Sequence, residues 1–320
     1  MSASFTGAAR EEFADTGRGI TLCFERIGDP GGIPLVLISG LGQQLHAWPT
    51  RLCTLLAERG FAVHRFDNRD SGRSTHVELP PPSPWAMLTG RYDPRQYHLG
   101  DLARDTVGLL DALELPSAHL VGMSMGGMIG QTVAAHFPSR ARSLVSLFSN
   151  TGAKRLGRPA WSTWPLLLGS PPKNRAAAAD AAVRTYRHIG SHGFVFDEAW
   201  VRAEAEASWD RDPGDAAAAG VGRQMAAILS SGDRTRDLKT IRIPTLVVHG
   251  DLDRMVASSG GLATARAVPG ARLVTVAGMG HDLPSAVWPR LADLIEENTR
   301  RAAEASGDSE EGSGHAELSA

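Results

Sequence analysis

Short apolar runs recur along the chain, and several are continuous rather than alternating with polar residues. They predict strands at 20–27, 34–39, 62–66, 119–123, 144–148, 244–249 and 272–276. Between many of these runs, apolar residues follow helical spacing, which predicts helices at 48–59, 99–113, 129–136, 262–267 and 286–300. Continuous apolar strands are typical of a parallel sheet that helices cover on both faces. The pattern therefore predicts an α/β protein with a mostly parallel, doubly wound sheet.

One long interval interrupts this alternation of strands and helices. Residues 151–240 are rich in alanine and favour helices, notably at 175–188 and 198–209, so we interpret them as a helical cap inserted into the core. A shorter excursion at 77–96 contains Pro80, Pro81, Pro82 and Pro84, which do not continue a regular element. The predicted organisation is an N-terminal extension at 1–19, core segments at 20–150 and 241–301, the cap at 151–240, and a disordered acidic tail at 302–320.

Composition narrows the classes of function. The 320 residues are 42% hydrophobic and 21% charged with a formal net charge of −2, and the positive charges are scattered, so we expect no nucleic-acid partner. Two cysteines, Cys23 and Cys53, match no metal-ligand spacing, and we expect neither a metal nor a cofactor. No apolar stretch is long enough for a signal peptide or a membrane span. We expect a cytoplasmic protein without membrane association, as a monomer or homodimer.

The sequence from Val121 to Met128 contains the clearest chemical motif, a Gly-x-Ser-x-Gly pattern. Ser124 stands at its centre, after a predicted strand and before a predicted helix, with Gly122 and Gly126 on either side. This pattern is typical of a sharp strand-to-helix turn that exposes a nucleophilic serine. The motif is short, so its value depends on the catalytic partners found elsewhere in the chain.

A serine nucleophile needs a base to take its proton and an acid to orient that base. Asp251 and Asp253 follow one predicted strand, and His281 follows the next. The carboxyl ends of parallel strands meet at one edge of a sheet, so these side chains are expected to approach the serine. Either aspartate fits this position, and we favour Asp253 because Asp251 is well placed to cap the turn. His46 and His249 are less suitable bases than His281, which lies on a loop that can reach the serine.

Taken together, these motifs resemble those of the α/β-hydrolase family over about 20–300. The resemblance rests on Ser39-Gly40-Leu41-Gly42, the segment from Phe66 to Ser74, the serine motif, Gly250-Asp251-Leu252-Asp253 and Gly280-His281. It implies a catalytic triad of Ser124, Asp253 and His281. We interpret the segment from Asp67 to Ser74 as a scaffold of turn hydrogen bonds and ion pairs.

The same resemblance implies an oxyanion hole. Its donors would be the backbone N–H groups of Leu41 and Met125. Many members of the family carry a histidine before Gly40, where this chain has Ser39. The Leu41 N–H does not depend on that side chain, so we retain it as a donor.

Within the family, the segment from Val268 to Val287 and the Arg-Asp-Ser-Gly-Arg-Ser-Thr turn are similar to aclacinomycin methylesterase and its polyketide-tailoring relatives. The resemblance implies a carboxylesterase acting on a small-molecule ester, including a methyl ester of a bulky aromatic substrate, through an acyl-serine intermediate. Candidate pocket residues are Met123, Trp161, Trp164, Trp200 and Trp209. A lactonase, a cofactor-free haloperoxidase or perhydrolase using the same triad, and a ligand-binding protein with a vestigial triad are the alternatives.

Overall fold

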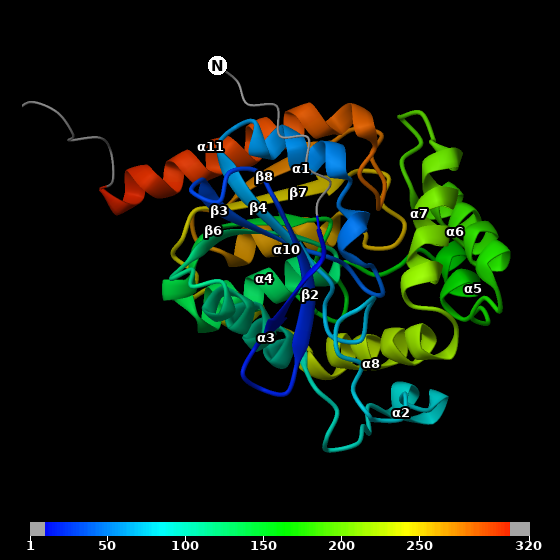
Figure 1. Cartoon of the computed structure of the whole chain (residues 1–320). Helices are drawn as coiled ribbons and strands as arrows, with labels where there is room; N and C mark the ends of the chain where they lie inside the picture. The colour runs from blue at the N-terminus through cyan, green and yellow to red at the C-terminus, as the bar shows by residue number, and fades with distance from the viewer. Residues whose placement is uncertain (1–9, 308–320) are drawn as a thin grey trace, which may run out of the picture.

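A computed structural model describes residues 10–307 and contains one mixed, mostly parallel sheet (Figure 1). Its eight strands follow the order β1-β2-β4-β3-β5-β6-β7-β8. The strands are β1 (Glu12–Asp15), β2 (Thr21–Ile27), β3 (Ile33–Ile38), β4 (Phe61–Phe66), β5 (Ala118–Met123), β6 (Ala141–Leu147), β7 (Thr245–Gly250) and β8 (Arg272–Val276). The pairs β1·β2 and β2·β4 are antiparallel and all others are parallel. The predicted α/β class and parallel sheet are therefore confirmed.

Helices cover both faces of the sheet, as the continuous apolar strands require. The core helices are α1 (Thr50–Ala57), α3 (Leu99–Ala112), α4 (Met125–His136), α10 (Ser259–Ala267) and α11 (Trp288–Ser306). One buried apolar cluster joins α1 and α11 to the sheet, and the other joins α3, α4 and α10 to its opposite face. Figure 1 shows these two layers of helices on either side of the strands. The core thus fixes β5 and α4, between which the serine lies.

The segment between β6 and β7 is mostly helical. Its helices are α5 (Trp164–Leu167), α6 (Arg175–Ile189), α7 (Glu198–Arg211), α8 (Asp215–Ser231) and α9 (Thr235–Leu238). In Figure 1, α5, α6 and α7 form a group beyond one end of the sheet. In contrast, α9 packs against α4 and α10 of the core. The final helix of the inserted segment 151–240 thus extends the core layer.

The structure differs from the sequence prediction at three places outside this insertion. The short strand β1 lies within 1–19, which was expected to precede the core, and it forms the edge of the sheet beside β2. A helix, α2 (Pro84–Thr89), forms in the proline-rich excursion because proline is compatible with a first helical turn and Ser83 caps it. The helix α11 continues past 301 and buries Ala302, while 308–320 of the predicted tail lie outside the described residues.

Two buried ion pairs attach the inserted helices to the loop that follows β4. Arg211 of α7 lies 2.6 Å from Asp67, and Arg223 of α8 lies 2.6 Å from Asp70. Asp67 also accepts hydrogen bonds from the backbone N–H groups of Leu45 and Arg73. These contacts agree with the scaffold role predicted for the segment from Asp67 to Ser74.

Replacing Arg223 with alanine is expected to lower the free energy of unfolding by about 3–5 kcal/mol, because it leaves Asp70 buried without its cation. The matched control is Arg202→Ala, which removes exposed pairs with Asp180 and Glu198 and should change the free energy of unfolding much less. Urea unfolding followed by circular dichroism measures both changes. Equal losses in the two variants would contradict the anchoring role of the buried pair.

Because two histidines are buried inside the sheet, we expect the protein to become less stable in mild acid. Burial, followed by the positive charges of Arg26 and Arg142 respectively, lowers the pKa of His64 and of His119 to about 4. In an unfolded chain a histidine has a pKa of about 6.5, so between these values the unfolded state binds more protons. The free energy of unfolding should therefore fall as pH decreases from 6.5 to 4, by up to about 1.4 kcal/mol per pH unit for each histidine. Urea titrations at several pH values test this, and His64→Gln should flatten the slope whereas exposed His136→Gln should not.

Candidate active site

The serine turn between β5 and α4 requires very close backbone packing. A Cβ atom on Gly122 would lie 2.1 Å from the carbonyl oxygen of Gly126, and one on Gly126 would lie 2.0 Å from that of Ile38. Only glycine fits at either position. Ser124 itself has φ 54° and ψ −117°, which is a strained backbone conformation for a residue with a side chain. The turn thus holds the serine at the start of α4, as the motif predicted.

The other two predicted residues lie beside this serine. His281, on the loop after β8, places its Nε2 atom 3.0 Å from Ser124 Oγ. Its Nδ1 atom lies 2.7 Å from Oδ2 of Asp253, on the loop after β7. Hydroxyl, imidazole and carboxylate therefore form one continuous hydrogen-bonded chain, drawn from three separate loops at the carboxyl edge of the sheet.

Asp253 is well suited to remain ionised in this chain. Its Oδ1 atom accepts hydrogen bonds of 2.8 Å from the backbone N–H groups of Met255 and Val256. Burial alone would raise the pKa of Asp253, but the charge of His281 and the hydrogen bonds from its neighbours lower that pKa to about 2. Asp251 instead accepts a 2.7 Å hydrogen bond from the Gly278 N–H and is exposed. The structure therefore places Asp253, and not Asp251, against the imidazole.

The two predicted oxyanion donors belong to the residue after the serine and to the loop after β3. Met125 follows Ser124 at the first position of α4, where a backbone N–H has no partner within the helix. Leu41 belongs to the loop after β3, and a Cβ atom on its neighbour Gly40 would lie 3.4 Å from Ser124 Cβ. Among residues 10–307, neither N–H donates to a loop, turn or side-chain acceptor. The Ser39 hydroxyl donates its hydrogen bond to the carbonyl oxygen of Gln44 in the same loop. It therefore does not occupy the N–H groups of Leu41 and Met125.

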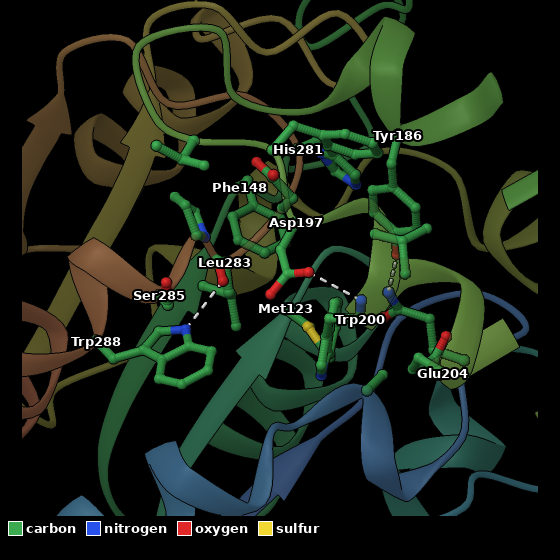
Figure 2. Close-up of a pocket in the computed structure, with 17 residues that line it drawn as sticks. Met123, Phe148, Tyr186, Asp197, Trp200, Glu204, His281, Leu283, Ser285 and Trp288 are labelled. Atoms are coloured by element: carbon green, nitrogen blue, oxygen red, sulfur yellow. Dashed lines mark hydrogen bonds between the residues drawn. The ribbon is translucent and has the colours of Figure 1, made fainter. Parts of the chain in front are cut away.

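A cavity opens beside His281, between the core and the cap helices α6 and α7 (Figure 2). Its lining residues are Gln43, Ala47, Met123, Phe148, Tyr186, Val195, Phe196, Asp197, Trp200, Val201, Glu204, His281, Asp282, Leu283, Pro284, Ser285 and Trp288. Met123 and Trp200 line it as predicted, whereas Trp161, Trp164 and Trp209 do not. Trp161 is 90% exposed and Trp164 is 43% exposed, because their short helices turn these side chains to solvent. Trp209 lies further along α7 than the lining residues Trp200 and Glu204.

Several pocket residues were not identified from the sequence. Tyr186 and Glu204 come from the cap, and Gln43, Phe148 and Trp288 from the core. None of them belongs to a recognisable motif, and only the docking of α6 and α7 over the sheet brings them together. Only Gln43 could have been identified as a pocket residue from the sequence, because it directly follows the segment Ser39-Gly40-Leu41-Gly42.

The cap also contacts the loop that carries His281. The N–H of His281 donates a 2.8 Å hydrogen bond to the carbonyl oxygen of Ile189, and the Gly193 N–H donates a 2.8 Å bond to Gly278. On the other side of the imidazole, the Phe148 ring packs edge to face at a centroid distance of 4.8 Å. The position of the imidazole therefore depends on both the core and the cap.

Within the described part of the chain we find neither a metal site nor a membrane-spanning helix. Residues 10–307 contain no group of three or more His, Cys, Asp or Glu side chains arranged to hold a metal ion. In the same range, no helix combines the length and the apolar character needed to cross a membrane.

Comparison with known proteins identifies the family. Residues 33–284 match the family model of the alpha/beta hydrolase fold, so the chain belongs to the α/β-hydrolase family. It is 30% identical to the rhodomycin D methylesterase DauP of a Streptomyces species, over 88% of this chain and 96% of that protein. It is 27% identical to 3-oxoadipate enol-lactonase 2 of Acinetobacter baylyi, over 77% and 81% of the two chains. The crystal structure of a hydrolase from Pseudomonas aeruginosa has a TM-score of 0.66 and 25% identity, covering 92% of this chain and 99% of that one.

Proposed function

We propose that the protein is a serine hydrolase that cleaves a carboxylic ester through an acyl-serine intermediate. The observation that carries this proposal is the hydrogen-bonded chain from Ser124 Oγ through His281 to Asp253, with distances of 3.0 and 2.7 Å. A side-chain arrangement of this kind activates a serine hydroxyl toward carbonyl carbon.

The proposed reaction has two halves. In the first, Ser124 Oγ attacks the ester carbonyl while His281 Nε2 takes the hydroxyl proton, and the N–H groups of Leu41 and Met125 bind the developing oxyanion. His281 then gives that proton to the departing alcohol, which leaves an acyl group on Ser124. In the second half, water attacks the acyl group with His281 as the base, and the acid is released. Asp253 orients the imidazole and stabilises its charged form throughout.

A methyl ester of a bulky aromatic acid is the proposed substrate type. The similarity to DauP over nearly its whole length supports this choice, as does a pocket with the aromatic rings of Phe148, Trp200 and Trp288. A lactone is the second candidate, supported by the similarity to the enol-lactonase of Acinetobacter baylyi. The same acyl-serine chemistry would open a lactone, so the two candidates differ only in the leaving group. Methyl esters and lactones of matched aromatic acids, assayed side by side, distinguish them.

The purified protein is expected to release p-nitrophenol from short acyl esters and to react with a fluorophosphonate at one residue. Mass spectrometry of the labelled, digested protein should place the adduct on Ser124, because His281 activates this hydroxyl. An adduct on Ser71 or Ser74, or labelling that does not abolish turnover, would contradict the assignment.

A further inference from the structure

Apart from His281 and Tyr186, the ionisable groups that line the cavity are all carboxyl groups. Asp197, Glu204 and Asp282 contribute carboxyl groups, and none of the lining residues is an arginine or a lysine. Figure 2 shows Asp197 and Glu204 among the side chains that surround the cavity. The chain as a whole has nearly balanced charge, with 33 basic and 35 acidic residues, so this one-sided lining does not follow from composition.

The three carboxyl groups differ in their partners. Asp197 caps α7 by accepting a hydrogen bond from the Trp200 N–H, and Asp282 accepts hydrogen bonds from the N–H and hydroxyl of Ser191. Glu204 accepts only the hydroxyl hydrogen bond of Ser208, one turn along its own helix. The first two groups therefore have structural roles, whereas Glu204 has none beyond its own helix.

The surroundings of Glu204 lack a cation. Burial raises its pKa, which favours the neutral acid until a cation binds, and the basic group that contacts it is His46, whose Nδ1 atom is 3.5 Å away. Burial, and then the charge of Arg211, lowers the pKa of His46 to about 4, so this imidazole is neutral near pH 7. Both of its ring nitrogens lack a hydrogen-bond partner within the described residues. Glu204 and His46, whose side chains are 18% and 21% exposed, thus form a mostly buried polar pair without a compensating charge.

Among the described residues, the buried carboxylates of Asp212 and Asp253 have histidine partners, and the four other buried carboxylates are paired with arginine. The pairs are Glu25 with Arg65, Asp67 with Arg211, Asp70 with Arg223, and Asp105 with Arg69. A carboxylate removed from water without a charged partner is costly, and each of these buried carboxylates has a basic partner. Glu204 contacts only the neutral His46, and it lines the same cavity as His281, where a bound molecule can supply a positive charge.

The aromatic walls suit the same kind of group. Tyr186 comes from α6 and Trp200 from α7, the helix that also carries Glu204, while Phe148 and Trp288 come from the core (Figure 2). Aromatic faces attract ammonium groups, and they do so most strongly where water is excluded. The Tyr186 hydroxyl accepts a 3.2 Å hydrogen bond from Gln43 Nε2, so its own proton is available to a ligand. Carboxylate and aromatic rings together favour a cation attached to an apolar body.

We propose that the cavity selects substrates by charge: it binds aromatic or aliphatic esters that carry a protonated amine, with Glu204 as the recognising group, and it rejects esters that carry a free carboxylate. This inference rests on the proposed esterase function and specifies its substrate class. For the lactone candidate named above, the proposal disfavours any lactone that carries a free carboxylate.

Matched inhibitors test the proposal without any mutation. Hydrolysis of p-nitrophenyl acetate at pH 7 is measured with 4-phenylbutylamine, 4-phenylbutanol or 4-phenylbutyrate as competitor. The ammonium compound should inhibit about tenfold more strongly than the alcohol, and the carboxylate should inhibit more weakly than the alcohol. Equal inhibition by amine and alcohol, or strongest inhibition by the carboxylate, would overturn the proposal.

A variant then assigns the effect to Glu204. In Glu204→Gln the ratio of the inhibition constants for alcohol and amine should fall by about tenfold, because the amide keeps the shape of the side chain and removes its charge. The matched control is Glu206→Gln on the same helix, whose carboxylate pairs with Arg175 outside the cavity and whose ratio should stay at the wild-type value. An unchanged ratio in Glu204→Gln, or an equal drop in both variants, would refute the role of Glu204.

The two proposals fail in different ways. If the protein hydrolyses no ester, or if a fluorophosphonate does not label Ser124, the esterase function is wrong. If esters are hydrolysed at Ser124 but p-nitrophenyl esters with ammonium, amide and carboxylate ends on the acyl chain react equally, and the inhibitors are also equal, only the charge selection is wrong.

Discussion

Replacement of Ser124 by alanine is expected to lower kcat for ester hydrolysis by about 10⁴- to 10⁶-fold. The variant removes the oxygen that would form the acyl intermediate, and His281 Nε2 loses its 3.0 Å partner. Alanine keeps the Cβ atom, so the strained backbone at φ 54° and the contacts of the turn should persist. The free energy of unfolding should therefore stay close to that of the wild type.

Rates with p-nitrophenyl acetate, urea unfolding and fluorophosphonate labelling together measure this effect. The control is Ser71→Ala, since Ser71 lies in the loop after β4 and accepts a hydrogen bond from Gln224. That variant should keep both activity and labelling. If Ser124→Ala retains more than a few per cent of wild-type kcat, a different nucleophile must be sought.

The sequence was sufficient to predict most of the sheet because several of its strands are continuous apolar runs. The exception is β1, which has only four residues and pairs antiparallel at the edge, where burial imposes little pattern. The helix α9 shows a second limit, since its residues resemble those of the preceding cap helices while its packing partners are α4 and α10. Which layer a short helix joins depends on contacts with distant parts of the chain.

The proximity of Ser124 and His281 could be predicted because both follow parallel strands whose carboxyl ends share one edge. The sequence favoured Asp253 over Asp251 only because Asp251 is well placed to cap the turn, since both aspartates lie on one turn. The structure separates them through hydrogen bonds to different segments: the N–H of Gly278 binds the first, and His281 binds the second. The two aspartates are only two residues apart in sequence. A pattern of residue types does not show which of two such close side chains faces the imidazole.

The pocket was the least predictable part of the site. Large apolar residues in the cap suggested pocket walls, yet Trp161 and Trp164 face solvent, while a glutamate and a tyrosine face the cavity. Residue type alone indicates burial in a core, but a cap helix has one side toward the substrate and another toward solvent. The side that faces the cavity is set by how α6 and α7 pack on each other and on the core.

Replacement of Asp253 by asparagine is expected to lower kcat by about 10³- to 10⁴-fold. The amide carries no charge to stabilise the imidazolium that forms during the reaction. In addition, an amide NH₂ directed at His281 Nδ1 favours the tautomer with the proton on Nε2, which cannot accept the proton of Ser124. The pKa of about 2 means that wild-type Asp253 stays ionised throughout the working range of a histidine base, so the wild-type rate should not depend on its titration.

The matched control is the same change two residues earlier. Asp251→Asn keeps an oxygen that can accept the 2.7 Å hydrogen bond from the Gly278 N–H, and its exposed position requires no charge partner. Its kcat should therefore remain within about tenfold of the wild type. Steady-state rates for both variants, with labelling of Ser124 as a separate readout, decide between the two aspartates. A larger loss in Asp251→Asn than in Asp253→Asn would show that the carboxylate nearest the imidazole is not the one that supports it in catalysis.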